Sequence, residues 1–264
     1  MADPQFQPEN LPSSQPAAVY VPVTAEDVAR QKRKVAAMIA IGVIVAMAAG
    51  WYIYRRMVDP VQAQQAYADG IGLFKANRYE QAILNFTRAV DLKPDFAEAY
   101  RMRGRAYAAI DKPDDAIPDF TKVSLLSPKD GSVLIERGFA YLDKKDLTHA
   151  MADASGALAI DSKLARAYNL RATVERAVGE TRKALDDFSR AVELAPNLDN
   201  YFQRAATYQM LNDHARAVAD FDEALLLSPD QAHTYYARAQ SRAALGDTQG
   251  AQEDIRAGRK IDGW

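Results

Sequence analysis

Residues 63–96 read AQQAYADGIGLFKANRYEQAILNFTRAVDLKPDF, and residues 97–130 read AEAYRMRGRAYAAIDKPDDAIPDFTKVSLLSPKD. The two stretches repeat one pattern: Gly70, Ala82, Phe86, Ala89 and Pro94 are followed 34 places later by Gly104, Ala116, Phe120, Val123 and Pro128. A period of this length is typical of stacked two-helix units. Because each unit buries its apolar face against the next, the period predicts an elongated solenoid that offers a binding surface.

The same pattern continues to the C-terminus. It divides the chain into six units, at 63–96, 97–130, 131–164, 165–197, 198–231 and 232–264, of which the fourth is one residue shorter. The eighth residue of every unit is Gly or Ala, and the twentieth is always Ala. Small residues at fixed places allow two antiparallel helices to approach closely. The sequence therefore predicts an all-α fold with two helices in each unit.

Residues that start and stop helices agree with this division. Asp146, Asp213 and Asp247 stand where a second helix needs an N-cap, and Pro113 suits a first helical turn. Four prolines mark the expected ends of second helices: Pro94, Pro128, Pro196 and Pro229. Pro118 falls inside the second helix of the second unit, where it is expected to remove one hydrogen bond and bend the helix.

The pattern resembles the tetratricopeptide repeat family over roughly three-quarters of the chain. The resemblance implies a right-handed superhelix whose concave groove is lined by the first helix of each pair. It also implies that the second, fifth, ninth and twelfth residues of these helices face the groove. Those positions give the expected partner-binding residues Tyr67, Ile71, Phe74, Arg101, Arg105, Ile135, Phe139, Leu142, Arg166, Asn169, Arg176, Phe202, His233 and Tyr236.

Apolar and Arg side chains together are typical of protein interfaces, and a peptide or helix is the expected occupant. The alternative for any one of these residues is burial between repeats. Some members of the family clamp a chaperone's C-terminal carboxylate with Lys and Asn. Here the corresponding positions hold Tyr67, Ile71, Met102, Ser132 and Glu136, so that clamp is absent.

A paired charge accompanies the repeat in units two to six. The seventh residue is Arg and the twenty-third is Asp, which predicts the structural ion pairs Arg103–Asp119, Arg137–Asp153, Arg171–Asp187, Arg204–Asp220 and Arg238–Asp254. The first unit has neither charge, carrying Asp69 and Asn85. The alternative, that these Arg residues bind anions, is weakened because each has a carboxylate candidate.

The N-terminal part is expected to contain a polar, Pro-rich disordered tail (1–24), a helix (25–58) and a linker (59–62). Thr24 and Asp27 form a possible capping box for that helix, and Asp59-Pro60 is expected to end it. Residues 35–54 carry no charge and would span about 30 Å as a helix, which is the hydrocarbon thickness of a membrane. Basic residues flank this span, and Trp51, Tyr52 and Tyr54 close it.

Two alternatives concern this span. It could be a signal peptide cleaved near Ala46-Met47-Ala48, although the polar stretch before it is long for one. Its small residues Gly42, Ala46 and Gly50 could pack against another membrane helix, or their spacing could be chance. More basic residues precede the span than follow it, which favours a cytoplasmic N-terminus. The repeats would then lie on the far side, in the periplasm if the source is bacterial.

Composition narrows the function classes. The net charge of −2 gives no indication of a nucleic-acid partner, and the absence of Cys excludes disulfides and thiolate sites. No catalytic residue, metal site or cofactor is expected, since the three His share no ligand spacing and Gly70-Ile71-Gly72 lacks a dinucleotide-binding spacing. Neither an enzyme nor a small-molecule substrate is predicted.

The expected function is a membrane-anchored scaffold or assembly factor that binds a protein partner in its groove, near other membrane or envelope proteins. One alternative is a structural accessory subunit of a larger membrane complex, packed through its transmembrane helix. Another is the reversed topology, as in a mitochondrial import receptor that faces the cytosol. The absent carboxylate clamp counts against this last alternative.

Overall fold

The computed structural model describes residues 24–263, except for the side chains of residue 27 and residues 54–58. The predicted tail therefore lies almost wholly outside the described residues, as does the Asp27 side chain of the expected capping box. Within the described part the chain forms twelve α-helices and no strand. It divides into two compact units, Met1–Met57 and Val58–Trp264. The all-α prediction is confirmed.

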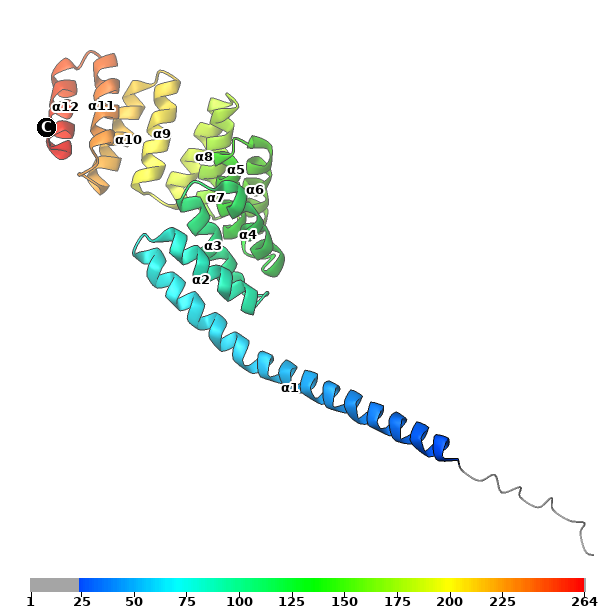
Figure 1. Ribbon diagram of the computed structural model, residues 1–264. Helices are drawn as coiled ribbons and strands as arrows, with labels where there is room; N and C mark the ends of the chain where they lie inside the picture. Colours follow the sequence, from blue (N-terminus) through cyan, green and yellow to red (C-terminus); the bar gives the residue numbers. More distant parts are fainter. Residues whose placement is uncertain (1–23, 264) are drawn as a thin grey trace, which may run out of the picture. The chain divides into compact units, whose positions relative to one another are not determined.

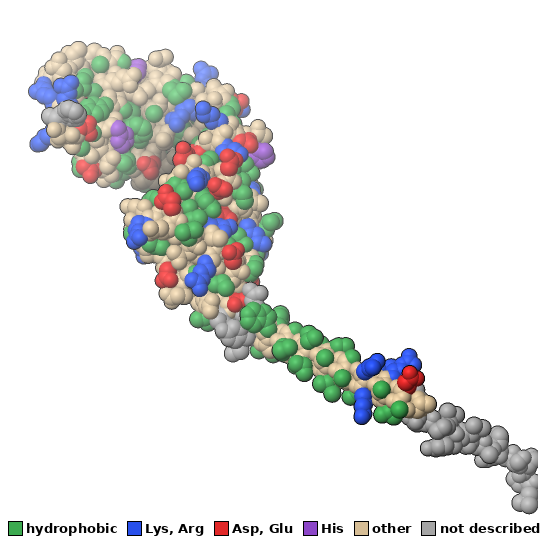
Figure 2. All heavy atoms as spheres, in the orientation of Figure 1, with side chains coloured by type: hydrophobic (Ala, Val, Ile, Leu, Met, Phe, Trp, Pro, Cys, Tyr) green, Lys and Arg blue, Asp and Glu red, His purple; other side chains and the backbone are tan. Residues whose placement is uncertain are grey.

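In the first of these units, α1 (Ala25–Lys75) begins directly after Thr24. Its segment Val28–Ile53 is long and apolar enough to cross a membrane, and none of its most apolar stretch is buried. Figure 2 shows the segment as a rod of hydrophobic side chains with Lys and Arg gathered at one end. A signal sequence near an N-terminus has the same properties, so length and composition alone do not distinguish the two.

The expected end of this helix at Asp59-Pro60, and with it the linker 59–62, is wrong. α1 continues through Pro60 to Lys75. Proline lacks an N–H, so one hydrogen bond of the helix is lost there. Pro60 is solvent-exposed, and the residues that follow it are held by packing: Ala63 and Ala66 are buried in a cluster with Ala89 and Phe96. The last turns of α1 thus serve as the first helix of the first repeat.

The second unit is a solenoid of helix pairs stacked along the chain (Figure 1). The end of α1 pairs with α2, and the remaining helices follow in order: α2 (Tyr79–Leu92), α3 (Ala97–Ala109), α4 (Pro113–Leu126), α5 (Gly131–Asp143), α6 (Leu147–Ile160), α7 (Ala165–Ala177), α8 (Thr181–Leu194), α9 (Leu198–Met210), α10 (His214–Leu227), α11 (Ala232–Ala244) and α12 (Thr248–Asp262). The first helices α3, α5, α7, α9 and α11 begin at the first residues of repeats two to six. The residue missing from repeat four is missing from the segment 195–197 between α8 and α9.

The predicted helix ends are confirmed. The side chains of Asp146, Asp213 and Asp247 accept a hydrogen bond from the backbone N–H three residues ahead, and Pro113 is the first residue of α4. Second helices end two residues before each of the four marking prolines. Pro118 lies within α4, which continues past it to Leu126.

One feature of the turns was not predicted. The fifteenth residue of every repeat lies between the paired helices in the left-handed region of backbone space, and these residues are Asn77, Asp111, Lys145, Gly179, Asn212 and Gly246. Asn, Asp and Gly tolerate this region, but Lys does not do so readily. The sequence alone could have predicted this conformation, because five of the six repeats have Asn, Asp or Gly at the fifteenth position and only the third has Lys.

Close packing of the small positions forms the core. Ala82, Ala116, Ala150, Ala184 and Ala217 have no exposed surface, and the rings of Phe86, Phe120, Phe188 and Phe221 are almost fully buried beside them. At Gly70 an added Cβ would lie 2.6 Å from the Phe86 ring, so glycine there permits the close approach. This packing holds the first helices side by side, so that they form a continuous surface.

Candidate binding groove

Two adjoining hollows lie along the first helices of the middle repeats. One of about 250 Å³ lies between α3, α5 and α7, and one of about 350 Å³ lies between α5, α7 and α9. The residues that line the first include Arg105, Ala108, Glu136, Phe139, Asp143 and Arg166; those that line the second include Phe139, Arg166, Asn169, Asp199, Asn200 and Gln203. Because both share Phe139 and Arg166, we treat them as one surface and call it the groove.

Phe139 and Arg166 stand at the centre of the groove. Phe139 lies on α5, half-buried against the core cluster that contains Leu170 and Val174. The guanidinium carbon of Arg166, at the start of α7, lies 5.7 Å from the centroid of the Phe139 ring. A cation over an aromatic face gains electrostatic stabilisation from the ring. The pair therefore offers a partner a flat apolar surface edged by positive charge.

Arg101 and Arg105 face this side of the solenoid, but both already form ion pairs with carboxylates of the protein. Arg101 donates to Glu136 at 2.9 Å, to Asp130 at 2.9 Å and to the Ser132 hydroxyl at 2.6 Å. Arg105 donates to the same Glu136 carboxylate at 3.1 Å. Burial alone would lower the pKa of Arg101, yet its bonds to Glu136 and Asp130 raise it. Both guanidinium groups are thus neutralised before any partner arrives.

A different arrangement surrounds α7, where Arg176 does not line either hollow but lies beside the groove, bonded to the lining residue Gln203. Arg176 donates to the Gln203 side chain of α9 at 2.7 Å and lies over the Phe188 ring at 5.2 Å. Burial lowers the pKa of Arg176. Between Arg166 and Arg176, Asn169 donates to Asn200 at 3.0 Å, and Asn200 in turn donates to the Ala195 carbonyl at 2.8 Å. These amides fix the spacing of α7 and α9.

The other predicted groove residues have mixed placements. Ile135 is wrong, because it is only 3% exposed and belongs to the core cluster beneath α5. Tyr67, Ile71 and Phe74 are half-buried against α2, and Leu142 is half-buried against the Ile135 cluster. In the C-terminal repeats, Phe202 contacts the rings of Phe221 and His233, while the exposed Tyr236 donates to Asp262 at 2.7 Å.

Two of the groove residues absent from the expected partner-binding set share one position, whereas others, such as Asp143 and Asn200, stand elsewhere in their repeats. Glu136 and Gln203 are each the sixth residue of their repeat, and both line the groove. The assumed groove positions did not include the sixth. On the sequence alone, Glu136 was assigned only to a position of the absent carboxylate clamp, and Gln203 to no site. Packing between repeats decides that the sixth residue faces the groove.

The five Arg–Asp pairs form as bidentate contacts between the two helices of one repeat. In repeat two, Arg103 donates to the two oxygens of Asp119 at 2.8 and 2.7 Å, and a third donor reaches Thr87 of the preceding repeat at 3.1 Å. Four more pairs have the same bidentate form: Arg137–Asp153, Arg171–Asp187, Arg204–Asp220 and Arg238–Asp254. The hydrogen bonds to Asp119 raise the pKa of Arg103. In repeat one, Asp69 and Asn85 make separate local contacts instead.

On α1, the small residues Gly42, Ala46 and Gly50 lie on an exposed length of helix. A Cβ added at either glycine would meet nothing within 4 Å. The stripe is therefore open within the described structure, and its packing against another membrane helix stays a prediction.

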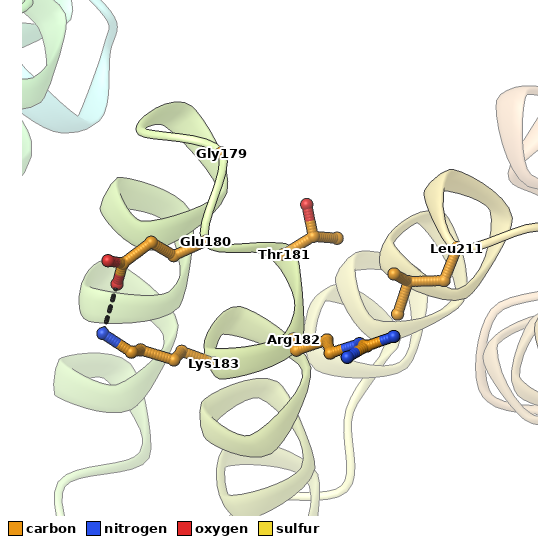
Figure 3. Close-up of a pocket in the computed structure, with 6 residues that line it drawn as sticks. All are labelled: Gly179, Glu180, Thr181, Arg182, Lys183 and Leu211. Atoms are coloured by element: carbon orange, nitrogen blue, oxygen red, sulfur yellow. Dashed lines mark ion pairs between the residues drawn. The ribbon is translucent and has the colours of Figure 1, made fainter.

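A further hollow, of about 440 Å³, lies outside the groove, at the turn between α7 and α8 (Figure 3). Its Glu180 and Lys183 side chains pair with each other at 2.7 Å, and Leu211 lines it from the end of α9. The charged residues that line it, Glu180, Arg182 and Lys183, are all exposed to solvent. Among residues 24–263, no group of three His, Asp or Glu side chains is arranged to hold a metal ion.

Comparison with known sequences agrees with the repeat architecture of the structure. Family models described as TPR repeat and tetratricopeptide repeat match residues 72–111 and 198–231. The human protein named tetratricopeptide repeat protein 6 is 24% identical over 68% of this chain, and human DnaJ homolog subfamily C member 3 is 27% identical over 77%. The chain covers only 35% and 44% of these two relatives, respectively. It thus spans less than half of either.

Among solved structures, the chain resembles PilW, described as a widely conserved type IV pilus biogenesis factor. The two share 18% identity with a TM-score of 0.68, over 75% of this chain and 92% of that one. At this identity the likeness concerns the fold.

Proposed function

Because the chain is a tetratricopeptide repeat protein, we propose that it is a membrane-anchored interaction scaffold whose groove holds a peptide or helix of a partner protein. The repeat fold itself supports a role in protein–protein interaction. The observation that carries the specific proposal is the groove around Phe139 and Arg166, where two adjoining hollows continue across four first helices.

The chemistry of the groove suits a polypeptide. Ring and aliphatic surface from Phe139 and Ala108 adjoins Arg166, Asn169 and Gln203, which supply hydrogen-bond donors along one side. Interfaces combine apolar anchors with such polar edges, and both aromatic residues and Arg are enriched in them. The polar groups lie on helices rather than on mobile loops, so they are held in place before binding.

Anchoring is the second part of the proposal. The apolar segment Val28–Ile53 supports a single membrane span, and the basic residues before it support a cytoplasmic N-terminus. The repeats would then lie across the membrane, in the periplasm of a bacterial source. PilW, a pilus biogenesis factor, is a precedent for an assembly role on this fold. Protease protection of the repeats in sealed inverted vesicles tests the orientation.

Site-specific photo-crosslinking tests where the partner binds. The full-length protein, purified with its partner in mild detergent, carries a benzophenone side chain in turn at Ala108, Asn169, Leu84 and Leu226. The first two positions line the groove. Leu84 and Leu226 are exposed on second helices, at 71% and 79%. Ala108, Leu84 and Leu226 are exposed, whereas Asn169 is half-buried and bonded to Asn200, so circular dichroism verifies that each variant is folded.

We expect crosslinks to the partner from Ala108 and Asn169 and none from the two controls. Crosslinks from Leu84 and Leu226 alone would place the partner on the opposite face and contradict the groove. A probe at Ala46 in α1 distinguishes the alternative role: a structural subunit held by its membrane helix should crosslink there and co-migrate with its complex in fixed ratio.

A further inference from the structure

We propose that α7 makes the groove selective for an acidic partner segment, with carboxylates that pair with Arg166 and Arg176. The inference rests on the proposed function, since it concerns what the same groove accepts. It adds the charge of the ligand, the helix that recognises it and the spacing of its acidic residues.

The Arg residues of the first helices differ in what they contact. Six of them pair with an Asp of their own repeat, including Arg242 at 3.1 Å from Asp254, and Arg101 and Arg105 share Glu136. Arg166 and Arg176 differ, because their contacts are an aromatic ring and, for Arg176, also a neutral amide. Within the described residues 24–263, neither forms an ion pair. Asp199 lines the same hollow as Arg166 without pairing with it.

Arg176 supports the inference more strongly than Arg166, because its unpaired charge is half-buried. Its guanidinium lies between the Phe188 ring and the Gln203 amide, and burial alone accounts for the lowered pKa of Arg176. A cation removed from water without an opposing charge is unfavourable. A carboxylate from a partner would supply that charge, and its bond to a guanidinium would be stronger than one between neutral groups.

The spacing of the two Arg residues limits the ligand. They are ten positions apart on α7, or about 15 Å along the helix axis. An extended chain covers that length in about four or five residues. The fitting segment is therefore extended, with two carboxylates about four positions apart. Towards α5 the groove contains Glu136 and Asp143, which would repel such a segment. Acidic residues should thus lie along α7 and apolar ones over Phe139.

A binding measurement with the full-length protein in detergent tests this selectivity. The probe is a short fluorescein-labelled Gly-Ser-Leu peptide with two Glu about four positions apart, and its matched copy carries Gln instead. The variant combines Arg166→Gln with Arg176→Gln. The control combines Arg88→Gln with Arg182→Gln, which removes equal charge from exposed sites on α2 and α8. Circular dichroism verifies that both variants are folded.

We expect the wild type and the control to bind the Glu peptide, and the α7 variant to bind it about tenfold more weakly or worse. The Gln peptide should bind all three weakly. Equal binding of the Glu peptide by the α7 variant and the wild type would overturn the inference, as would equal losses in variant and control or no binding by the wild type.

The crosslinking experiment separates this inference from the proposed function. If the partner still crosslinks from Ala108 and Asn169 but binds the α7 variant unchanged, the groove stands and the acidic selectivity is wrong. If no groove position crosslinks, the proposed function itself fails.

Discussion

At the scale of single residues, Lys145 is the least favourable choice at its position. It has a φ of 61° in the turn between α5 and α6, where the other repeats use Asn, Asp or Gly. The left-handed conformation costs a residue such as Lys about 1–2 kcal/mol. Glycine avoids this strain, but part of the gain is offset because glycine loses more backbone entropy on folding. We expect Lys145→Gly to raise the free energy of unfolding by about 0.5–1 kcal/mol in urea denaturation.

Gly179, at the equivalent position of repeat four, is the matched control. Its φ is 84°, so Gly179→Ala should lower stability even though an added Cβ would meet nothing within 4 Å. A loss of stability in Lys145→Gly would contradict the conformational explanation.

Glu175 is a second residue at odds with its surroundings. It is 8% exposed on α7, and its Oε2 has no hydrogen-bond partner among the described residues. Burial and the nearby Asp187 raise the pKa of Glu175 above its ordinary value of 4.5. Since the charged form is disfavoured in the folded state, Glu175 costs stability at neutral pH, and this cost disappears as the pH falls towards 4.5.

We therefore expect Glu175→Met to stabilise the protein by about 1 kcal/mol at pH 7, with the gain shrinking as the pH falls towards the ordinary Glu pKa. Thermal unfolding of both proteins across that range measures the difference. A gain that stays constant with pH would show that the effect does not come from ionisation.

At the scale of the helices, the repeated Arg–Asp pairs connect the two helices of each repeat. Arg171 contacts both oxygens of Asp187, whose side chain is 12% exposed, and also lies over the Tyr168 ring. Removing the cation leaves a mostly buried carboxylate unpaired. We expect Arg171→Ala to lower the free energy of unfolding by about 2 kcal/mol while leaving groove binding unchanged.

Denaturation of Arg171→Ala beside Arg182→Ala provides the comparison. Arg182 is exposed on α8 and should cost no more than about 0.5 kcal/mol. Equal stability of the two variants would mean that the Arg171–Asp187 pair contributes nothing measurable.

The continuity of α1 leads to a prediction about Pro60. A proline inside a helix removes one hydrogen bond, and at Pro60 the helix continues because Ala63 and Ala66 are packed in the first repeat. Replacing it should strengthen a helix that already exists. We expect Pro60→Ala to raise the melting temperature and slow amide hydrogen exchange in residues 58–66. Unchanged exchange there would argue that α1 is interrupted at this point in solution.

At the scale of the whole molecule, the proposal combines a membrane span with a soluble repeat surface. The most apolar 18 consecutive residues of the segment Val28–Ile53 have a mean hydropathy of 2.1, whereas the chain as a whole has −0.30. We expect the full-length protein to stay with membranes after an alkaline wash and to be released only by detergent. Release by the wash alone would remove the anchor from the proposal, and a shortened N-terminus found by mass spectrometry would identify a cleaved signal peptide instead.

Much of the fold follows from the sequence, because its determinants are local. A 34-residue period, N-cap aspartates such as Asp146 and terminating prolines such as Pro94 act within a few residues of where they stand. Ion pairs such as Arg103–Asp119 could also be predicted from the sequence. Arg and Asp recur together at a spacing of 16 residues in five repeats and are both absent from the first, which indicates that they contact each other.

The tertiary structure alone decided which side chains face the groove and which Arg residues are paired, because both depend on contacts between distant segments. Ile135 is buried and Glu136 faces the groove because packing between repeats sets the rotation of α5. Glu136, together with Asp130, then neutralises Arg101 and Arg105, which lie 35 and 31 residues before Glu136. The same packing leaves Arg166 and Arg176 without carboxylates, and it continues α1 past Pro60. The sequence alone determined which residues form helices and turns, whereas the side that each helix presents required the free energy of packing one repeat against the next.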